Sequence, residues 1–207
     1  METQKEIFNL LVITSPDIFP GETNYINFFL DNGASAVYIR KENYSNINLT
    51  SFFKEIKTEH HQKIILPFSI IDALVYENYR PIIHFKEKDR TAENLSQLPN
   101  NATLSTSIHE FSELENLTEN YKYVFYSPVF ESISKPNYKP KITLEEIQKD
   151  LGNREKGIEG LIALGGVSSE NILQIKNAGF NGAALLGSIW NDENPKERFL
   201  KIISKIF

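Results

Sequence analysis

The sequence contains no cysteine, which excludes a disulfide framework, a thiolate zinc site and a cysteine nucleophile. It also lacks a surplus of positive charge, because 22 Lys and Arg stand against 27 Asp and Glu and give a formal net charge of −5. Broad nucleic-acid binding needs clustered Lys and Arg, so we predict no nucleic-acid partner. Apolar runs such as Phe8 to Thr14 are far shorter than the roughly 20 residues of a transmembrane helix, so we predict no membrane partner.

What is present is a chain of 207 residues with 41% hydrophobic content, enough to bury one sizeable core. Residues 1–6 carry two acids and one lysine, which does not resemble a secretory signal, and we therefore expect a cytoplasmic location. No Gly/Ser-rich linker or low-complexity tract divides the chain. We expect residues 1–207 to form one compact domain, and the formation of a homo-oligomer is left open.

Short apolar or β-branched runs alternate with segments of helical spacing along the chain. We predict eight strands, at 8–14, 36–40, 63–68, 81–85, 102–107, 123–126, 160–164 and 182–186. We predict helical segments at 22–32, 48–59, 70–79, 91–98, 111–120, 143–151, 168–178 and 196–206. Because the strands are apolar on consecutive positions, we expect them to be parallel and covered on both faces.

Eight such units favour a closed (β/α)8 TIM barrel, which is an α/β fold. A chain of 207 residues lies at the compact end of the size range of that fold. The alternative is an open doubly wound sheet. Its Gly-x-Gly-x-x-Gly fingerprint is missing, since the loop after the first predicted strand, residues 14–18, reads Thr-Ser-Pro-Asp-Ile. Active sites of barrels lie at the carboxyl ends of the strands, so the residues that close each predicted strand are the candidates.

Small residues close the last two predicted strands. Gly165 and Gly166 end the seventh, just before a helix, and Leu186, Gly187 and Ser188 end the eighth. Glycine lets the backbone approach a ligand, and a helix N-terminus offers N–H groups to an anion. A tight turn alone would explain a single Gly-Gly pair, but the two loops together favour a phosphate site.

Cations and hydroxyls close other strands. Arg40 ends the second predicted strand, where its guanidinium could grip a phosphate or pair with a carboxylate at the rim. Ser107 ends the fifth. The loop after the sixth carries Ser132, Ser134 and Lys135, which can donate several hydrogen bonds to one polyanion, although such a run is also ordinary loop chemistry.

These residues fall within ordered motifs that resemble the thiamine phosphate synthase/TenI superfamily. The resemblance covers nearly the whole chain in the order and approximate spacing of that family. The motifs that carry it are Val37–Lys41, Ser105–His109, Tyr123–Lys135, Ile162–Val167 and Gly179–Ile189.

The resemblance implies a barrel enzyme, a transferase of thiamine biosynthesis. Such an enzyme couples hydroxymethylpyrimidine diphosphate to thiazole phosphate and releases diphosphate with Mg²⁺, so its predicted partners are phosphorylated small molecules. The implied catalytic residues, on the diphosphate side, are Arg40, Ser107 and Lys135. The implied residues on the thiazole side are Ser132, Ser134, Gly166, Leu186 and Gly187.

The second predicted strand departs from the synthase pattern Gln-x-Arg-x-Lys. Tyr38 stands at the position of the glutamine, and Glu42 stands at the position of the second cation. An acid there would repel a diphosphate unless Lys41 turned inward to replace the lost charge. We therefore include Tyr38 and Lys41 among the predicted substrate-binding residues.

The predicted magnesium site is also altered. Ile70 occupies one ligand position, and Asp72, two positions further on, belongs to a predicted helix. Asp89 is the carboxylate that keeps a metal-ligand position, with Lys86 and Lys88 beside it. A single carboxylate next to two lysines is a poor magnesium site, and these lysines could instead supply charge directly to a phosphate.

Two other functions stay open. A TenI-like tautomerase acting on a thiazole phosphate uses a histidine in the loop after the sixth strand, where this chain has Pro128. His84 and His109 are then the candidate bases. The second alternative is a non-catalytic binder of a phosphate ligand that has lost the metal site.

Overall fold

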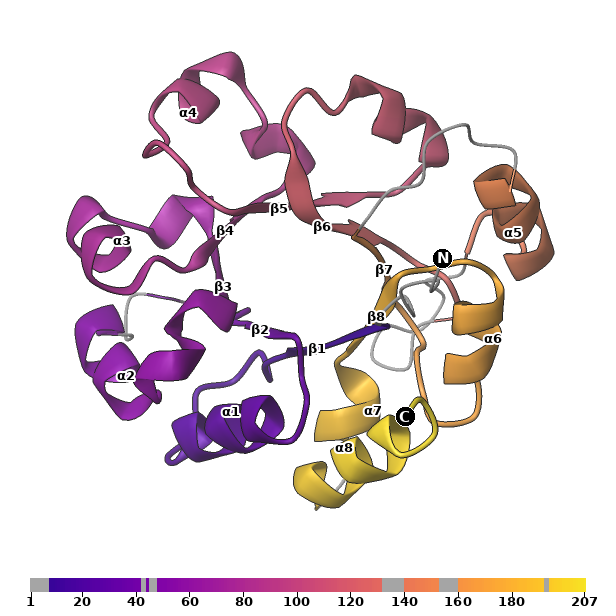
Figure 1. Ribbon diagram of the computed structural model, residues 1–207, viewed down its shortest axis with the longest axis horizontal. Helices are drawn as coiled ribbons and strands as arrows, with labels where there is room; N and C mark the ends of the chain where they lie inside the picture. The colour runs from indigo at the N-terminus through magenta and orange to yellow at the C-terminus, as the bar shows by residue number, and fades with distance from the viewer. Residues whose placement is uncertain (1–7, 42–43, 45–47, 132–139, 153–159, 192–193) are drawn as a thin grey trace, which may run out of the picture.

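The computed structural model describes residues 8–41, 44, 48–131, 140–152, 160–191 and 194–207. Its eight strands form a closed parallel barrel in sequence order, with β1 paired to both β2 and β8. Figure 1 looks into one end of this barrel and shows the helices as an outer ring. The strands are Asn9–Ile13 (β1), Ala36–Tyr38 (β2), Ile64–Pro67 (β3), Ile82–Phe85 (β4), Leu104–Ile108 (β5), Tyr121–Tyr126 (β6), Leu161–Ala163 (β7) and Gly182–Leu185 (β8). The predicted (β/α)8 fold is confirmed.

Helical segments connect the strands, but several are shorter than the sequence predicts. The α-helices are Glu22–Asp31 (α1), Leu49–Glu55 (α2), Ala73–Tyr79 (α3), Ala92–Ser96 (α4), Leu144–Gly152 (α5), Ile172–Asn177 (α6), Gly187–Trp190 (α7) and Pro195–Ile203 (α8). The described residues also contain four 3-10 turns: Thr58–Lys63 (η1), Phe68–Ile70 (η2), Glu87–Asp89 (η3) and Phe111–Asn116 (η4). The predicted α-helix at 111–120 is therefore wrong in type and in length.

Local capping explains where several helices begin. Thr143 accepts a bond from the Glu146 amide at 3.2 Å, and the Glu146 carboxylate accepts one from the Thr143 amide at 2.7 Å, a reciprocal cap for α5. The Asp72 carboxylate accepts from the Val75 amide at 2.8 Å and caps α3. Each cap satisfies an amide that has no partner within its helix.

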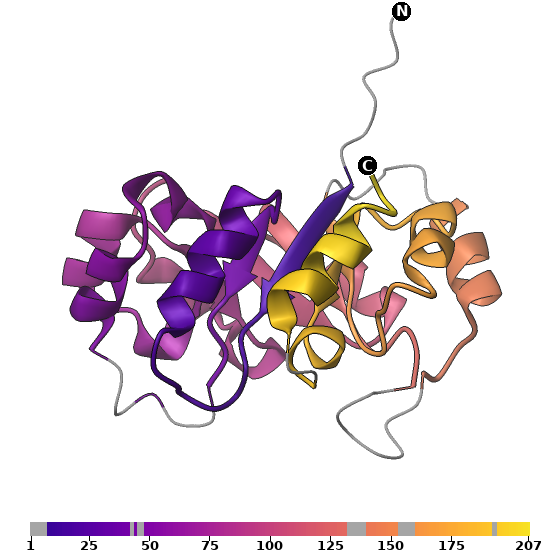
Figure 2. The ribbon, with the colours of Figure 1, turned by 90° about the horizontal axis from the view of Figure 1, so that it is seen from below.

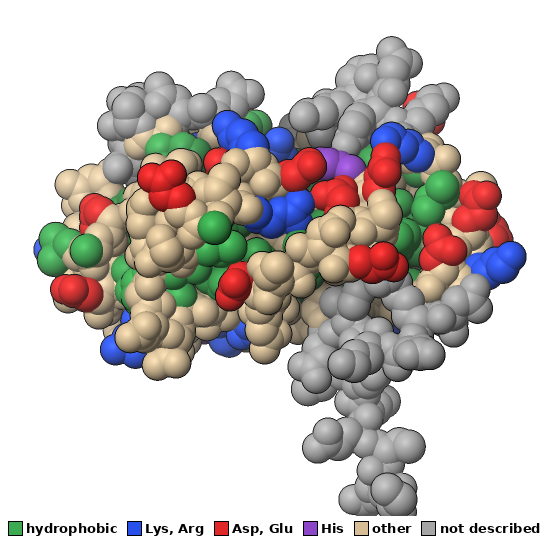
Figure 3. All heavy atoms as spheres, turned by 90° about the horizontal axis from the view of Figure 1, so that it is seen from above, with side chains coloured by type: hydrophobic (Ala, Val, Ile, Leu, Met, Phe, Trp, Pro, Cys, Tyr) green, Lys and Arg blue, Asp and Glu red, His purple; other side chains and the backbone are tan. Residues whose placement is uncertain are grey.

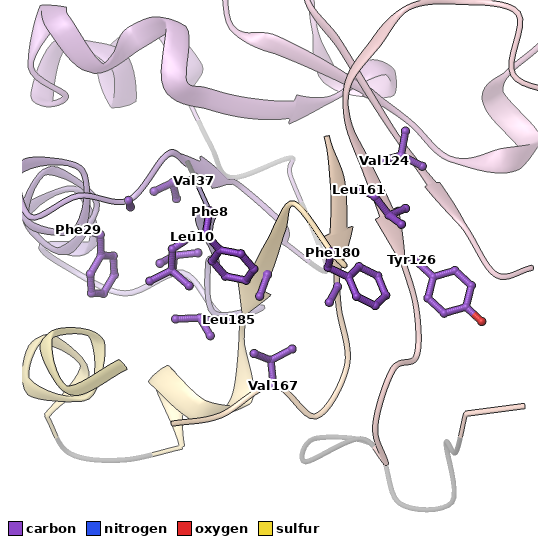
Figure 4. Packing of buried hydrophobic residues seen from close by; sticks show 14 of the residues in the cluster. Phe8, Leu10, Phe29, Val37, Val124, Tyr126, Leu161, Val167, Phe180 and Leu185 are labelled. Carbon is purple, nitrogen blue, oxygen red and sulfur yellow. The ribbon is translucent and has the colours of Figure 1, made fainter. Parts of the chain in front are cut away.

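Two apolar layers hold the barrel. The inner layer fills the interior with side chains that point inward from the strands: Leu11, Ile13, Ala36, Tyr38, Ile65, Ile82, Tyr123, Phe125, Ile162 and Ala184. The outer layer lies between strands and helices. Figure 4 shows part of it, with Leu10, Val37 and Leu185 directed away from the barrel interior toward Phe29 of α1 and Val167. Alternate residues of a strand serve the two layers, which explains why the strands are apolar throughout.

Trp190 of α7 connects the C-terminal part of the barrel to β1 and α1. The Trp190 Nε1 donates to the Ile13 carbonyl at 2.7 Å, and the indole makes edge contacts with Phe19, Tyr25 and Phe29. Figure 2 shows α8 beside α1 and β1 on the same side of the barrel.

No helix in the described residues is long and apolar enough to cross a membrane.

Candidate functional site

A cavity of about 520 Å³ opens at the carboxyl ends of the strands. Its floor is apolar and includes Ile13, Tyr38 and Phe125, while its rim carries the polar and glycine residues that follow the strands. The rim residues are Arg40, Lys86, Glu87, Lys88, Ser107, His109, Ser127, Gly165, Gly166, Leu186 and Gly187. Of the sequence-predicted site residues, the structure therefore brings Tyr38, Arg40, Ser107, Gly165, Gly166, Leu186 and Gly187 around one cavity.

A buried histidine lies in the floor between two serines. His84 Nδ1 is 3.0 Å from the Ser105 Oγ, and its Nε2 is 3.0 Å from the Ser107 Oγ. The Tyr38 ring packs on the imidazole with 4.7 Å between centroids. Because β4 and β5 pair in parallel with His84 beside Ser105, all three polar side chains point into the barrel. The imidazole thus fixes the hydroxyl of Ser107, which faces the cavity.

Charge and burial keep this histidine neutral. Burial lowers the pKa of His84 to about 3, and the nearby cations Lys86, Arg40 and Arg90 act in the same direction. A neutral imidazole can donate from one nitrogen and accept at the other, so it can bond to both serines at once. With so low a pKa, His84 is a weak base near neutral pH and acts as a hydrogen-bonding partner for Ser107.

The neutral state of His84 gives the stability of the protein a defined pH dependence. The pKa of His84 is lower in the folded protein than in the unfolded chain, so on acidification the unfolded chain is protonated at a higher pH. The stability that neutral His84 contributes is therefore lost as pH falls below about 6.5. Relative to a His84→Gln variant, the free energy of unfolding of the wild type should fall by about 1.4 kcal/mol per pH unit between about pH 6 and pH 4. Urea unfolding of both proteins measures this difference, and parallel pH profiles would contradict it.

Lys41 does not lie in the cavity lining. Its ammonium is buried against the Glu22 carboxylate and also donates to the carbonyls of Ser15 at 2.7 Å and Asp17 at 2.9 Å. Burial raises the pKa of the Glu22 carboxyl, and the Lys41 ammonium opposes that rise. The lysine therefore joins the end of β2 to the β1–α1 loop. The structure does not bring it to the substrate-binding position predicted for it.

The glycines of the β7 loop allow close packing as well as access to the cavity. Gly165 and Gly166 have φ of +97° and +66°, which favours glycine. A Cβ on Gly166 would lie 2.5 Å from the Glu131 carbonyl oxygen and 2.6 Å from the Phe130 Cβ. The Phe130 amide donates to the Gly165 carbonyl at 3.1 Å, so the loops after β6 and β7 lie side by side.

The β8 loop supplies the other small residues. Leu186 and Gly187 line the cavity at the start of α7, where the first amides have no partner within the helix. The Ser188 Oγ is buried and has no hydrogen-bond partner among the described residues. Ser188 does not line the cavity, so the polar groups that this loop offers to a ligand there are the backbone groups of Leu186 and Gly187.

Three predicted residues, Ser132, Ser134 and Lys135, lie outside the described residues. Several lining residues are not among the site residues predicted from the sequence: the polar Glu87 and Ser127 and the apolar Ile13, Phe125, Leu164, Val167 and Ala184. The alternation of side chains along barrel strands could have found Ile13, Phe125 and Ala184, because each lies two positions from another interior residue.

The described residues do not fit the predicted magnesium site. Mg²⁺ usually binds one or two carboxylates together with substrate phosphates, and cations beside such a carboxylate repel the ion. Among the described residues, Glu87 is the one carboxylate in the cavity lining, and it stands between Lys86 and Lys88. Asp89 is half-buried outside that lining. No group of three or more His, Asp or Glu that could hold a metal occurs in the described part of the chain.

Comparison with known proteins agrees with this geometry. A thiamine-phosphate synthase of Prochlorococcus marinus strain AS9601 is 36% identical over 93 residues, which cover 44% of this chain and 24% of that protein. The thiamine-phosphate synthase of Pyrococcus abyssi is 23% identical over 208 residues, covering 98% of both chains. A crystal structure of thiamine phosphate pyrophosphorylase from Bacteroides thetaiotaomicron superposes with a TM-score of 0.75 and 25% identity, covering 95% of this chain and 96% of that one.

The family model described as thiamine monophosphate synthase matches residues 10–189, from β1 into α7. The match includes every cavity residue named above. The chain therefore belongs to the thiamine monophosphate synthase family.

Proposed function

We propose that this protein is a thiamine-phosphate synthase that couples hydroxymethylpyrimidine diphosphate to thiazole phosphate. The observation that carries the proposal is one cavity with cations on the β2 and β4 side and glycine loops on the β7 and β8 side, in a chain of this family. Such a cavity has room for two phosphorylated substrates arranged with their anionic groups at opposite sides. The apolar floor of Tyr38 and Phe125 would then lie under the heterocyclic rings.

The reaction needs charge stabilisation more than a base. The bond between the pyrimidine methylene carbon and the diphosphate oxygen breaks, and its electron pair leaves with the diphosphate. The thiazole nitrogen then donates its lone pair to that carbon to form the new C–N bond, and no proton is transferred. Arg40 would stabilise the leaving diphosphate, and Ser107, held by His84, would donate a hydrogen bond to it.

Lys135, Ser132 and Ser134 keep the roles predicted from the sequence as part of this proposal. The proposed phosphorylated substrates fit the local charge of the cavity. The predicted cytoplasmic location, the single domain of residues 1–207 and the question of a homo-oligomer stay predictions.

A TenI-like tautomerase has less support. The low pKa of His84 makes it a poor base, and Pro128 cannot transfer a proton. His109 lines the cavity, where its Nδ1 donates to the Ser127 carbonyl at 2.7 Å.

The synthase proposal is tested by mixing purified protein with both substrates and measuring thiamine phosphate, with and without added magnesium. We expect product. We also expect Arg40→Gln to lower kcat roughly 100-fold, because the leaving diphosphate loses the guanidinium that stabilises its charge. Lys149→Gln is the matched control, since Lys149 is exposed on α5 and does not line the cavity. Absence of product under every magnesium condition would overturn the proposal, and binding of thiazole phosphate without turnover would favour the non-catalytic binder.

A further inference from the structure

We propose that Lys86 and Lys88, together with Arg40, form a metal-independent diphosphate site at the mouth of the cavity. The identity of the anion rests on the proposed function, whereas the site itself rests on the charges that the structure places there. The proposal gives the two lysines a role that replaces the altered magnesium site.

The three cations lack an acidic partner among the residues that the structure describes. In the described part of the chain, none of Arg40, Lys86 and Lys88 forms an ion pair. Other cations of the barrel are paired, as Lys41 is with Glu22 and Arg90 is with Glu113 at 3.0 Å. Unpaired cations that share a cavity repel one another, and an anionic ligand would relieve that repulsion.

The strand order places these cations on both sides of one position. Arg40 follows β2, and Lys86 to Lys88 follow β4, while β3 lies between the two strands. The position after β3 at which the sequence predicts a metal ligand is Ile70, whose side chain packs against the outer core. Ile70 does not line the cavity, so a group bound there meets positive charge from two sides without a ligand from the third.

The nearby carboxylates do not offset this charge. Asp72 caps α3 through the Val75 amide at 2.8 Å and does not line the cavity. The Asp89 carboxylate also lies outside the lining, although its negative charge, like burial, raises the pKa of the Tyr38 phenol. Among the described residues this leaves Glu87 as the acid in the lining, set against three cations.

The positive charge is local. Figure 3 shows one side of the molecule, on which acidic and basic side chains are interspersed and form no continuous patch of one sign. The whole chain has a net charge of −5, so general attraction of anions to its surface is not expected. A diphosphate would be drawn to this rim by Arg40, Lys86 and Lys88 specifically.

Calorimetric titration with inorganic diphosphate tests the proposal at constant ionic strength, in EDTA and in excess magnesium. We expect binding in EDTA with a Kd within about threefold of that in magnesium. A Lys86→Gln/Lys88→Gln variant should weaken binding roughly tenfold, because two charge-assisted contacts are lost. Lys149→Gln should bind as the wild type does. Binding only in magnesium, or unchanged binding by the double variant, would overturn the proposal.

Glu87→Gln gives a second test, because its effect on diphosphate affinity differs in sign between direct binding by the cations and binding through a metal ion. If cations hold the diphosphate directly, removing the acid between Lys86 and Lys88 tightens binding in EDTA. If the carboxylate held a metal for the anion, the same change would weaken binding in magnesium, and that result would contradict the proposal. All three side chains are exposed, so these changes are not expected to disturb folding, and circular dichroism checks this.

The two proposals can fail separately. Diphosphate binding in EDTA that depends on the lysines, without formation of thiamine phosphate, would support the anion site and overturn the synthase. Thiamine phosphate formation that requires magnesium and is unaffected in the double lysine variant would support the synthase and overturn the anion site.

Discussion

Replacing Lys41 by methionine is expected to lower the free energy of unfolding by about 3–5 kcal/mol, because the change leaves a buried carboxylate without its partner. The side chains of Lys41 and Glu22 are 1% and 7% exposed, and two carbonyls of the β1–α1 loop lose a donor at the same time. Chemical denaturation measured in urea checks the value. Lys57→Met is the control, since the ion pair of Lys57 with Asp31 is solvent-exposed and should change stability little.

The Lys41→Met defect should depend on pH in a defined direction. Burial already raises the pKa of Glu22, and without the opposing ammonium the pKa rises further. A carboxyl whose folded pKa lies above its unfolded value contributes stability at low pH and loses it as pH rises. The defect should therefore shrink on acidification below neutral pH and in the double variant Glu22→Gln/Lys41→Met. A defect that is the same in all these conditions would show that the buried charge is not its cause.

Gly166→Ala is the second change with a large expected effect, about 2–4 kcal/mol of destabilisation. Two costs combine, because φ of +66° disfavours an L side chain and the new methyl group would overlap the Glu131 carbonyl and Phe130. Relief of that overlap moves the β6 loop away from the β7 loop, so thiazole phosphate binding should weaken as well. Urea unfolding and calorimetry measure the two effects.

Gly21→Ala separates the two costs of the Gly166 change. Gly21 has φ of +78°, but the nearest atom to an added Cβ is the Asn24 Nδ2 at 3.5 Å. We therefore expect about 1 kcal/mol from backbone strain alone and unchanged ligand binding. Equal losses in Gly21→Ala and Gly166→Ala would mean that the overlap with the β6 loop has no energetic consequence.

The strands could be predicted because they depend on local sequence, and the cavity rim could be predicted once those strands were placed in a barrel. A buried parallel strand reads as a short apolar run, and barrel topology brings the residues after every strand to one end. Arg40, Ser107 and Gly187 come together for this reason. The sequence predicts the loop glycines as phosphate ligands, but their contact with the β6 loop depends on a neighbouring strand and leaves no signal nearby in the chain.

Side-chain partners across elements could not be predicted in this way. Lys41 is close in sequence to Arg40, yet it turns toward Glu22 on α1, and only the packing of α1 against β2 decides that orientation. The Phe111–Asn116 segment has apolar spacing typical of a helix. There, the Glu113 carboxylate accepts from the amides of His109 at 2.7 Å and Glu110 at 2.9 Å, and the segment forms a 3-10 turn.

The position of Trp190 makes it an intrinsic fluorescence probe of barrel closure. It is the single tryptophan of the chain, and its indole bridges α7 and the end of β1 through the Ile13 carbonyl and the ring contacts with α1. Excitation of that indole therefore samples the seam at which the first and last strands close the ring. Fluorescence emission can follow that closure during refolding without an added dye, and separately from events at the cation-lined side of the cavity.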